Sequence, residues 1–429
     1  MKHTFSLYAL LFLLSAVVYF SVSGHGFMTA WDDQWMIFNK YTFGGLSVQN
    51  LSALFSETYQ GQYSPINQLS YTVLYAVFGA NPQAFHLASL LWHLVNVCLV
   101  FAFVKTLLNL RESENTGQVS GTAFLTALLF ALHPINTEAV AWISASKVPL
   151  YAMFGLSALL CYMHYLKSGS KFSFSGSIVF FLLSFGCKEQ AFVLPLAVLL
   201  IDWFSGRDFR DKKLWIEKLP FLALMLLGGI FTLSLRSPEL IQYRAGYPLW
   251  QRLIFACYAL TEYLTKLAVP LNLMYVYPFP MAPGYPLPVR FLIYPLIVSA
   301  LAGVVVYYRK HAVPVFGALF FLLNLSLSLH LVSISRVTIV ADRYVYLSGI
   351  GFFMVLSWYG LKFFSTLSKL WKKILLCCTF AVYLLYLAGY AQKRSLVWQD
   401  NDSLKKEMRE LLDKRKSDEK SLPADTGIQ

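Results

Sequence analysis

The chain has 429 residues, of which 57% are hydrophobic and only 13% are charged. Its mean hydropathy of +0.55 excludes a soluble globular domain of this length. The formal net charge of +13 does not indicate nucleic-acid binding, because the lysines and arginines concentrate in short connecting loops. We therefore expect a polytopic membrane protein whose surroundings are the lipid bilayer, with no nucleic-acid partner.

Apolar runs long enough to cross about 30 Å of hydrocarbon recur along nearly the whole chain. Tryptophan and tyrosine cluster near the ends of these runs, as expected for rings at the headgroup level. We predict an all-α polytopic membrane protein with a bundle of about 11 transmembrane helices, at residues 5–23, 84–108, 120–135, 148–166, 173–187, 190–204, 218–235, 291–308, 312–332, 344–364 and 374–391.

The basic residues predict the orientation of this bundle. With a cytoplasmic N-terminus, four of the five cytoplasmic loops are clearly basic, in line with the positive-inside rule. These four loops are residues 167–171, 205–218, 307–311 and 369–373, whereas the loop 111–121 is near neutral. We expect a bacterial inner membrane or an ER-type membrane, with residues 24–83 on the periplasmic or lumenal side.

Two segments leave alternatives open. Residues 250–270 are apolar but carry Arg252, Glu262 and Lys266. We favour an interfacial or re-entrant helix there over a span, because a span would put the later basic loops outside. The first apolar run also fits a cleaved signal peptide, although no clear cleavage site follows it.

We predict a transmembrane domain over residues 1–391. Its first external loop, residues 24–83, contains two short stretches, 47–55 and 64–79, that are typical of amphipathic helices on a membrane surface. Residues 392–429 form a short tail on the same external side, expected as a helix followed by disorder.

Asp32 and Asp33 follow the first span and are flanked by Trp31 and Trp35 in the stretch WDDQWMIFNK. One interpretation is a helix cap with surface charge, since aspartate commonly caps helices. The other is a general base, because a partly desolvated carboxylate has a raised pKa that suits proton abstraction. The acidic doublet between two tryptophans favours the second interpretation.

His133, Glu138 and Lys147 lie together in HPINTEAVAWISASK, between the third and fourth spans. Two candidate metal ligands without a third do not indicate a divalent metal, and His133 fits a role in orienting Glu138 or a substrate hydroxyl. Lys147 and Lys188 are lone cations at the outer ends of apolar helices. They are either snorkelling lysines or a cationic clamp for a lipid-linked phosphate.

Asp342 and Arg343 begin a predicted span in the stretch ADRYVYLSGIG. Such a pair can be purely structural, because burying either charge alone is costly. Arginine is also the residue best shaped to grip a phosphate with two parallel hydrogen bonds.

The carboxylates, cations and aromatic residues therefore gather on one side of the membrane. Sugar transfer needs a base for the acceptor hydroxyl and positive charge for the departing phosphate. A polyprenyl phosphate sugar is the expected donor outside the cytoplasm, and a protein, a glycan or a lipid is the acceptor. The alternative is a transporter or flippase, which predicts polar residues at mid-membrane and two similar halves.

The same residues carry a family resemblance. The chain resembles the GT-C glycosyltransferases, in the branch of the transmembrane and tetratricopeptide-repeat O-mannosyltransferases and their bacterial relatives. The matching stretches occur in family order and cover most of the chain. They are WDDQWMIFNK, QYSPINQLSY, FGANPQAFHLASLLWHLVN, LLFALHPINTEAVAWISASK, CKEQAFVLPLAVLLIDW, YVYPFP, ADRYVYLSGIG and RSLVWQDNDSL.

The resemblance implies a catalytic base at Asp32 or Asp33, an often mannose-bearing polyprenyl phosphate donor, and inversion at the anomeric carbon. It implies a cavity in which Lys147, Lys188 and Arg343 bind the donor phosphate. Further residues that it places along this cavity are His133, Glu138, Asp342 and Tyr344.

Two departures from the family pattern bear on these expectations. The C-terminal repeat array of many relatives is not seen, so acceptor recognition is expected from the external loops or a partner protein. Val148 and Pro149 stand where relatives often carry an acidic residue.

Overall fold

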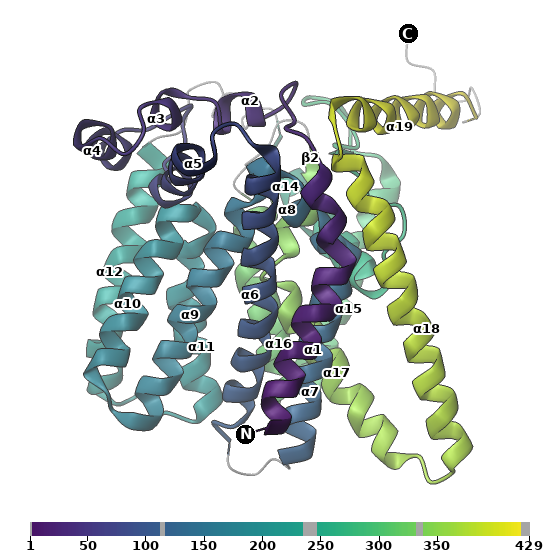
Figure 1. Ribbon diagram of the computed structural model, residues 1–429. Coiled ribbons are helices and arrows are strands. Elements are labelled where there is room, and N and C mark those ends of the chain that lie inside the picture. The colour runs from purple at the N-terminus through teal and green to yellow at the C-terminus, as the bar shows by residue number, and fades with distance from the viewer. Residues whose placement is uncertain (1, 112–115, 235–246, 332–337, 422–429) are drawn as a thin grey trace.

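The computed structural model describes residues 2–111, 116–234, 247–331 and 338–421, and helices dominate it. Figure 1 shows long helices running side by side between two ends of the molecule, with the N-terminus at the lower end. Each of the predicted apolar runs overlaps one of these helices. They are α1 (Lys2–Tyr19), α6 (Pro82–Leu108), α7 (Thr116–Leu132), α9 (Lys147–Ser168), α10 (Lys171–Cys187), α11 (Leu194–Ser205), α12 (Lys212–Ser234), α15 (Ile293–Tyr307), α16 (Ala312–Leu325), α17 (Gly349–Thr366) and α18 (Leu370–Ser395).

Within the described residues, six helical segments are long and apolar enough to cross a membrane. A seventh is counted if α7 and the segment Pro134–Ala141, bent by 54° at His133, form one span. The prediction of an all-α, multi-pass membrane protein is confirmed. The number of eleven spans stays a prediction, because the remaining helices do not meet that test.

The predicted run 190–204 differs most from the structure. It begins as a 3₁₀ turn, η4 (Glu189–Val193), and its α-helix α11 has only 12 residues. Twelve residues rise about 18 Å, which is less than the hydrocarbon thickness. The predicted run 344–364 likewise begins as a 3₁₀ turn, η7 (Asp342–Val345), before α17.

Local sequence signals explain where several helices begin and end. Gly169 ends α9 and Gly206 ends α11, both in the left-handed conformation that glycine adopts without strain. Ser170 then caps α10 by accepting a hydrogen bond from the backbone N–H of Ser173 (3.3 Å). Gly169 and Ser170 together make the tight connection between α9 and α10.

Two glycines let α16 and α17 approach closely. A Cβ atom at Gly317 would lie 2.7 Å from the carbonyl oxygen of Gly351, and one at Gly351 would meet the carbonyl of Gly317. Small residues at such crossings allow helix backbones to touch in membranes.

Short elements cover the upper end of the bundle (Figure 1). The predicted surface helices 47–55 and 64–79 correspond to α4 (Val48–Ser56) and α5 (Pro65–Phe78). Residues 250–270 form α14 (Leu249–Ala268), which is not among the candidate spans, so its interfacial placement stays a prediction. The two strands, β1 (Tyr277–Pro278) and β2 (Thr338–Val340), pair antiparallel.

The C-terminal helix α19 (Asn401–Ser421) lies across the same upper end as α2–α5 (Figure 1). The predicted tail is thus a helix on the side of Asp32 and Asp33, and residues 422–429 lie outside the described part. The remaining elements are η1 (Phe20–Gly24), α2 (Asp33–Met36), α3 (Lys40–Phe43), η2 (Pro134–Asn136), α8 (Thr137–Ala141), η3 (Ile143–Ala145), η5 (Val289–Leu292), η6 (Ser326–Ser328) and η8 (Leu396–Trp398).

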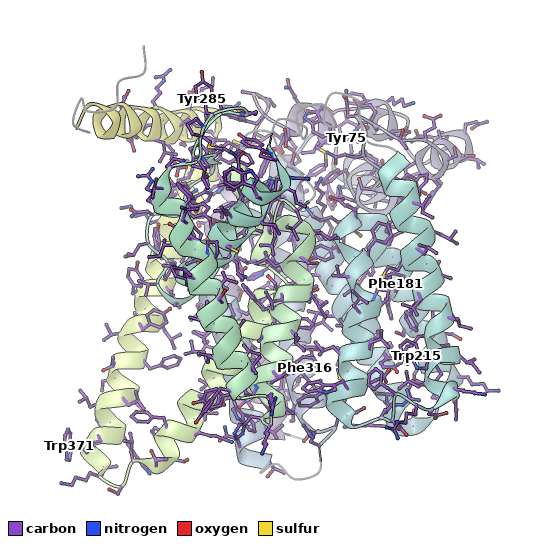
Figure 2. The ribbon with its side chains drawn as sticks, turned by 180° about the vertical axis from the view of Figure 1, so that it is seen from behind. Tyr75, Phe181, Trp215, Tyr285, Phe316 and Trp371 are labelled. Atoms are coloured by element: carbon purple, nitrogen blue, oxygen red, sulfur yellow. The ribbon has the colours of Figure 1, made fainter. Side chains whose placement is uncertain are left out.

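A buried ionic network joins α9, α11 and α12 away from that upper end. Asp202 is completely buried and pairs with Lys218 (2.8 Å) and Arg207 (3.1 Å). Tyr162 donates a hydrogen bond to Asp202 (2.5 Å), and Glu217 pairs with Arg207 (2.7 Å). Figure 2 shows Trp215 of α12 near the lower end and Tyr285 near the upper end. The charged residues of 205–218 therefore hold helices together, and their role in setting the orientation stays a prediction.

Candidate active site

Asp33 is completely buried at the upper end of the bundle, where its carboxylate joins two segments of the chain. Its Oδ2 accepts a hydrogen bond from the backbone N–H of Met28 (2.8 Å). Its Oδ1 accepts from the backbone N–H of Ser144 (3.1 Å) and from the Ser144 hydroxyl. Burial raises the pKa of Asp33, whereas these hydrogen bonds lower it. Asp33 thus fixes the first external loop to the segment that enters α9.

Asp32 has different surroundings from its neighbour. It is half-buried, and its Oδ1 accepts a hydrogen bond from the indole N–H of Trp35 (3.3 Å). Its carboxylate interacts with the charge of Lys147. The two adjacent aspartates are therefore not equivalent, since Asp33 is occupied by backbone donors and Asp32 is accessible.

Lys147 begins α9 and is half-buried beside the first external loop. Its ammonium donates a hydrogen bond to Oε1 of Gln62 (3.0 Å). The charges of Glu189, Arg343 and Asp32 also act on it. Lys147 therefore lies among charged groups from three other parts of the chain.

Lys188 is buried directly after α10, with its ammonium 5.6 Å from the centroid of the Tyr344 ring. Burial, together with the nearby cations Lys147 and Arg343, lowers the pKa of Lys188 to about 7. The carboxylates of Glu189 and Glu138 act in the opposite direction. Glu189 follows Lys188 in sequence, but sequence reasoning did not single it out.

Arg343 is held by a carboxylate and two rings. Its backbone N–H donates to Oε2 of Glu138 (3.0 Å), and its guanidinium forms an ion pair with the same carboxylate. The guanidinium carbon lies 5.4 Å from the Trp142 ring centroid and 5.0 Å from that of Tyr344. Such cation–π contacts suit arginine beside aromatic faces.

Asp342 and Arg343 have separate partners, so the alternative of a purely structural pair between them does not describe their contacts. Asp342 is buried and accepts a hydrogen bond from the Tyr277 hydroxyl (2.7 Å), whereas Arg343 pairs with Glu138. Burial raises the pKa of Asp342, as does the nearby Glu138. Neighbouring side chains of the 3₁₀ turn η7 point in different directions around its axis, so Asp342 and Arg343 reach different partners.

His133 lies in the turn between α7 and α8, and its role in orienting a substrate hydroxyl stays a prediction. Its Nδ1 accepts a hydrogen bond from the backbone N–H of Ile135 (3.2 Å), so the ring caps the turn η2. Its ring packs against Phe353 at a centroid distance of 5.2 Å. The described contacts thus link Glu138 to Arg343 and not to His133.

Four aromatic side chains, Trp31, Trp142, Tyr275 and Trp398, form a cluster beside Arg343, which we call the aromatic cluster. Trp142 and Trp398 stack at 5.0 Å, and Tyr275 meets both of them edge-on. Trp31 contacts Tyr275 edge-on at 5.2 Å. The indole N–H groups of the three tryptophans are buried without a hydrogen-bond partner among the described residues.

Trp398 brings the C-terminal segment into this region. The carbonyl of Gln399 accepts a hydrogen bond from the backbone N–H of Gly26 (2.8 Å). Asn401 accepts from the backbone N–H of Ala30 (3.0 Å) and donates to the Thr29 hydroxyl (3.0 Å). The sequence predicted that this tail lies on the side of Asp32 and Asp33, but it did not predict these contacts.

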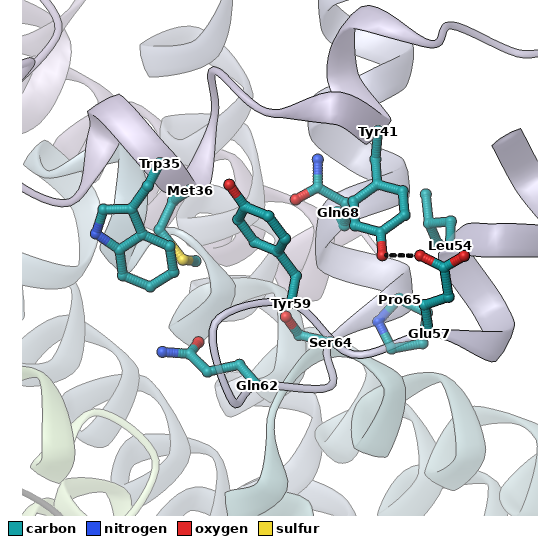
Figure 3. Close-up of a pocket in the computed structure, with 10 residues that line it drawn as sticks. All are labelled: Trp35, Met36, Tyr41, Leu54, Glu57, Tyr59, Gln62, Ser64, Pro65 and Gln68. Carbon is teal, nitrogen blue, oxygen red and sulfur yellow. Dashed lines mark hydrogen bonds between the residues drawn. The ribbon is translucent and has the colours of Figure 1, made fainter. Parts of the chain in front are cut away.

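A small pocket opens within residues 24–83 (Figure 3), and its Trp35 contacts Asp32. We call it the loop pocket. Trp35 forms part of its wall, and the Tyr41 hydroxyl donates to Glu57 within it (2.9 Å), as the dashed line in Figure 3 marks. Its lining consists of Trp35, Met36, Tyr41, Leu54, Glu57, Tyr59, Gln62, Ser64, Pro65 and Gln68.

The structure thus brings most of the predicted site residues into one neighbourhood. Mutual charge interactions or contacts connect Asp32, Lys147, Lys188, Glu138, Arg343 and Tyr344. Asp33 and Asp342 are buried next to these residues and accept hydrogen bonds from Ser144 and Tyr277. In the part of the chain that the structure describes, no three His, Cys, Asp or Glu side chains are grouped to hold a metal ion.

Comparison with known proteins finds sequence relatives that are named protein O-mannosyl-transferases. The chain is 32% identical over 190 residues to mouse protein O-mannosyl-transferase TMTC1, covering 42% of this chain and 18% of that protein. It is 26% identical over 286 residues to protein O-mannosyl-transferase F38B6.6 of Caenorhabditis elegans, covering 62% and 38%. Mouse protein O-mannosyl-transferase TMTC2 is 37% identical over 177 residues, covering 40% and 20%.

No protein-family profile matches the chain. The chain spans between about a fifth and two fifths of the length of these three relatives. It is therefore a homologue, over part of its length, of membrane proteins named protein O-mannosyl-transferases.

Proposed function

We propose that this protein is a membrane glycosyltransferase that transfers mannose from a polyprenyl phosphate donor to a hydroxyl group of a protein. The observation that supports this most is the gathering of one accessible carboxylate, Asp32, with the cations Lys147, Lys188 and Arg343 at one end of the bundle. A carboxylate base beside a phosphate-binding set of cations is what sugar transfer from a lipid phosphate needs.

In the proposed reaction, Asp32 accepts the proton of the acceptor hydroxyl as its oxygen attacks the anomeric carbon. The bond between that carbon and the phosphate oxygen breaks, and the polyprenyl phosphate departs with the bonding electrons. Lys147, Lys188 and Arg343 stabilise the charge that develops on the phosphate. A single displacement of this kind inverts the configuration of the anomeric carbon.

The choice of Asp32 over Asp33 rests on hydrogen bonding and burial. Both carboxylate oxygens of Asp33 already accept hydrogen bonds from Met28 and Ser144, and the side chain is completely buried. A base must come within hydrogen-bond reach of the acceptor hydroxyl. Asp32 is accessible and Asp33 is occupied, so we assign the base to Asp32 and a positioning role to Asp33.

The donor and its sugar follow from chemistry and from the relatives. The relatives are named protein O-mannosyl-transferases, which indicates mannose as the sugar and a protein as the acceptor. A lipid-linked donor suits cations that lie at the outer ends of apolar helices. The aromatic cluster holds three buried indole N–H groups beside Arg343 that have no partner among the described residues, which suits hydrogen bonds to sugar hydroxyls.

The topology that accompanies this function has eleven spans and a cytoplasmic N-terminus. The upper end, with Asp32 and Arg343, then faces the periplasm or the ER lumen. The basic loops between the helices support this orientation.

Purified protein in detergent, incubated with radiolabelled polyprenyl phosphate mannose, glucose and galactose, tests the proposal. We expect binding and slow hydrolysis of the mannose donor, and transfer to a peptide that contains Ser and Thr. A variant that carries both Lys188→Met and Arg343→Met lacks two of the three proposed phosphate-binding cations and should lose donor binding. Absence of binding and hydrolysis for every donor would refute the proposed function.

A further inference from the structure

We propose that the loop pocket binds a side chain of the acceptor polypeptide and so presents a neighbouring hydroxyl to Asp32. This inference rests on the proposed function and adds the site at which the acceptor is recognised. Four observations support it: the position of the pocket, its charge, its rigid wall and its narrow lining.

The pocket lies one side chain away from the proposed base. Trp35 lines the pocket and donates its indole N–H to Oδ1 of Asp32 (3.3 Å). On another side, Gln62 lines the pocket and accepts a hydrogen bond from Lys147 (3.0 Å). A ligand seated in the pocket would therefore touch residues that contact both the base and a cation of the donor site.

The charge of the pocket separates it from the donor site. Glu57 is the charged residue of its lining, and it is paired with Lys40 (2.5 Å) and with the Tyr41 hydroxyl (2.9 Å). Among the described residues that line the pocket there is no cation, whereas a phosphate requires positive charge. The pocket therefore suits an uncharged, polar ligand, as expected of an acceptor and not of a lipid phosphate.

One wall of the pocket is a preformed turn. Tyr59 and Gln62 exchange two backbone hydrogen bonds, of 3.0 and 2.9 Å. Gln60 (φ 51°) and Gly61 (φ 69°) between them both adopt the left-handed conformation, as in the tightest hairpin turns. A wall fixed in this way loses little entropy when a ligand binds.

The lining fits one side chain of a polypeptide better than a sugar ring or a lipid tail. The rings of Trp35, Tyr41 and Tyr59 and the apolar Met36 and Pro65 line a small space of about 30 Å³, and Tyr59 stands between Trp35 and Tyr41 in Figure 3. The amide of Gln62 and the hydroxyl of Ser64 offer hydrogen bonds to a backbone that passes over it. Aromatic rings with adaptable polar groups are typical of peptide-binding surfaces.

The test compares two reactions of the full-length protein with radiolabelled polyprenyl phosphate mannose. One is transfer to a synthetic peptide that contains Ser and Thr, and the other is hydrolysis of the donor without peptide. Tyr59→Ala removes a wall of the pocket. Ser64→Phe fills it at a position whose side chain caps no helix. Thr58→Phe, an exposed neighbour outside the lining, is the matched control.

We expect both pocket variants to raise the KM for the peptide about tenfold or more, equivalent to about 1.4 kcal/mol of lost binding. Donor hydrolysis and the control variant should stay at wild-type values. An unchanged peptide KM in both variants would overturn the inference, as would an effect confined to a mannoside acceptor. If the wild-type protein shows neither peptide transfer nor donor hydrolysis, the result refutes the proposed function on which the inference rests.

Discussion

The carboxylate of Asp33 accepts a hydrogen bond from the backbone N–H of Ser144 (3.1 Å), a residue 111 positions farther along the chain. This contact ties the first external loop to the start of α9, and Lys147 follows Ser144 by one turn. Asp32 directly precedes Asp33, and its charge acts on Lys147. A buried aspartate therefore sets the geometry between an accessible aspartate and a cation.

Replacement of Asp33 should act through the fold. Asp33→Asn puts an amide N–H₂ where Met28 and Ser144 donate, so at least one buried N–H loses its acceptor. Each such group costs about 1–3 kcal/mol. We expect a lower free energy of unfolding in a denaturant titration in detergent, whereas the exposed neighbour Gln34→Ala should be neutral. An Asp33→Asn protein that is inactive yet as stable as wild type would show that Asp33 takes part in the chemistry.

Donor binding should depend on pH through Lys188. The pKa of Lys188 is lowered from 10.5 to about 7, so its ammonium is charged below pH 7 and neutral above it. A phosphodiester donor keeps its negative charge across this range. We therefore expect the donor Kd to rise as the pH increases from 6 to 8.5, by up to about tenfold per pH unit above 7.

The Lys188→Arg variant is the control for this profile, because arginine stays charged at every pH used. Donor titrations by calorimetry should give a flat profile for Lys188→Arg and a weak, flat profile for Lys188→Met. A wild-type profile that persists in Lys188→Arg would assign the titration to another group in that neighbourhood, such as Lys147, whose pKa is also lowered by burial.

The Glu138–Arg343 ion pair should be needed for stability as well as for donor binding. Glu138 is buried and Arg343 nearly so, and removing one partner of such a pair typically costs about 3–5 kcal/mol. We expect Glu138→Gln to lower the unfolding midpoint. The double variant Glu138→Gln with Arg343→Gln should recover much of that stability without recovering donor binding. Equal stability of Glu138→Gln and wild type would contradict this account of the pair.

The ionic network of Asp202 and Lys218 should be structural only. Both side chains are almost completely buried, at 2.8 Å, on helices α11 and α12. We expect Lys218→Met to cost about 3 kcal/mol and the double variant with Asp202→Leu to cost less. Transfer activity per folded molecule should be unchanged in both. A transporter that used this network would instead lose function in the double variant at full stability.

Composition and apolar runs predicted the fold class and the positions of the helices. The apolar run length did not predict the breaks at His133 and before Leu194, where a bend or a 3₁₀ turn interrupts an apolar stretch. Hydropathy does not reveal such turns, because the side chains before and after them are equally apolar.

The site was predicted by residue type more than by geometry. The positions of Asp32, Lys147, Lys188 and Arg343 in separate segments agreed with a shared cluster. Sequence reasoning could not distinguish Asp32 from Asp33, since that difference depends on Ser144 more than a hundred residues away. It also missed Glu189 and the role of Trp398, whose contacts are formed only by tertiary packing.

The most direct test of the central claim is the transfer rate of Asp32→Asn. The purified variant and wild type are compared with labelled polyprenyl phosphate mannose and a peptide containing Ser and Thr. We predict unchanged folding and donor affinity, and a fall in the transfer rate of about 10²–10⁴-fold, the usual contribution of a general base. A variant that transfers mannose at the wild-type rate would contradict the assignment of Asp32 as the base.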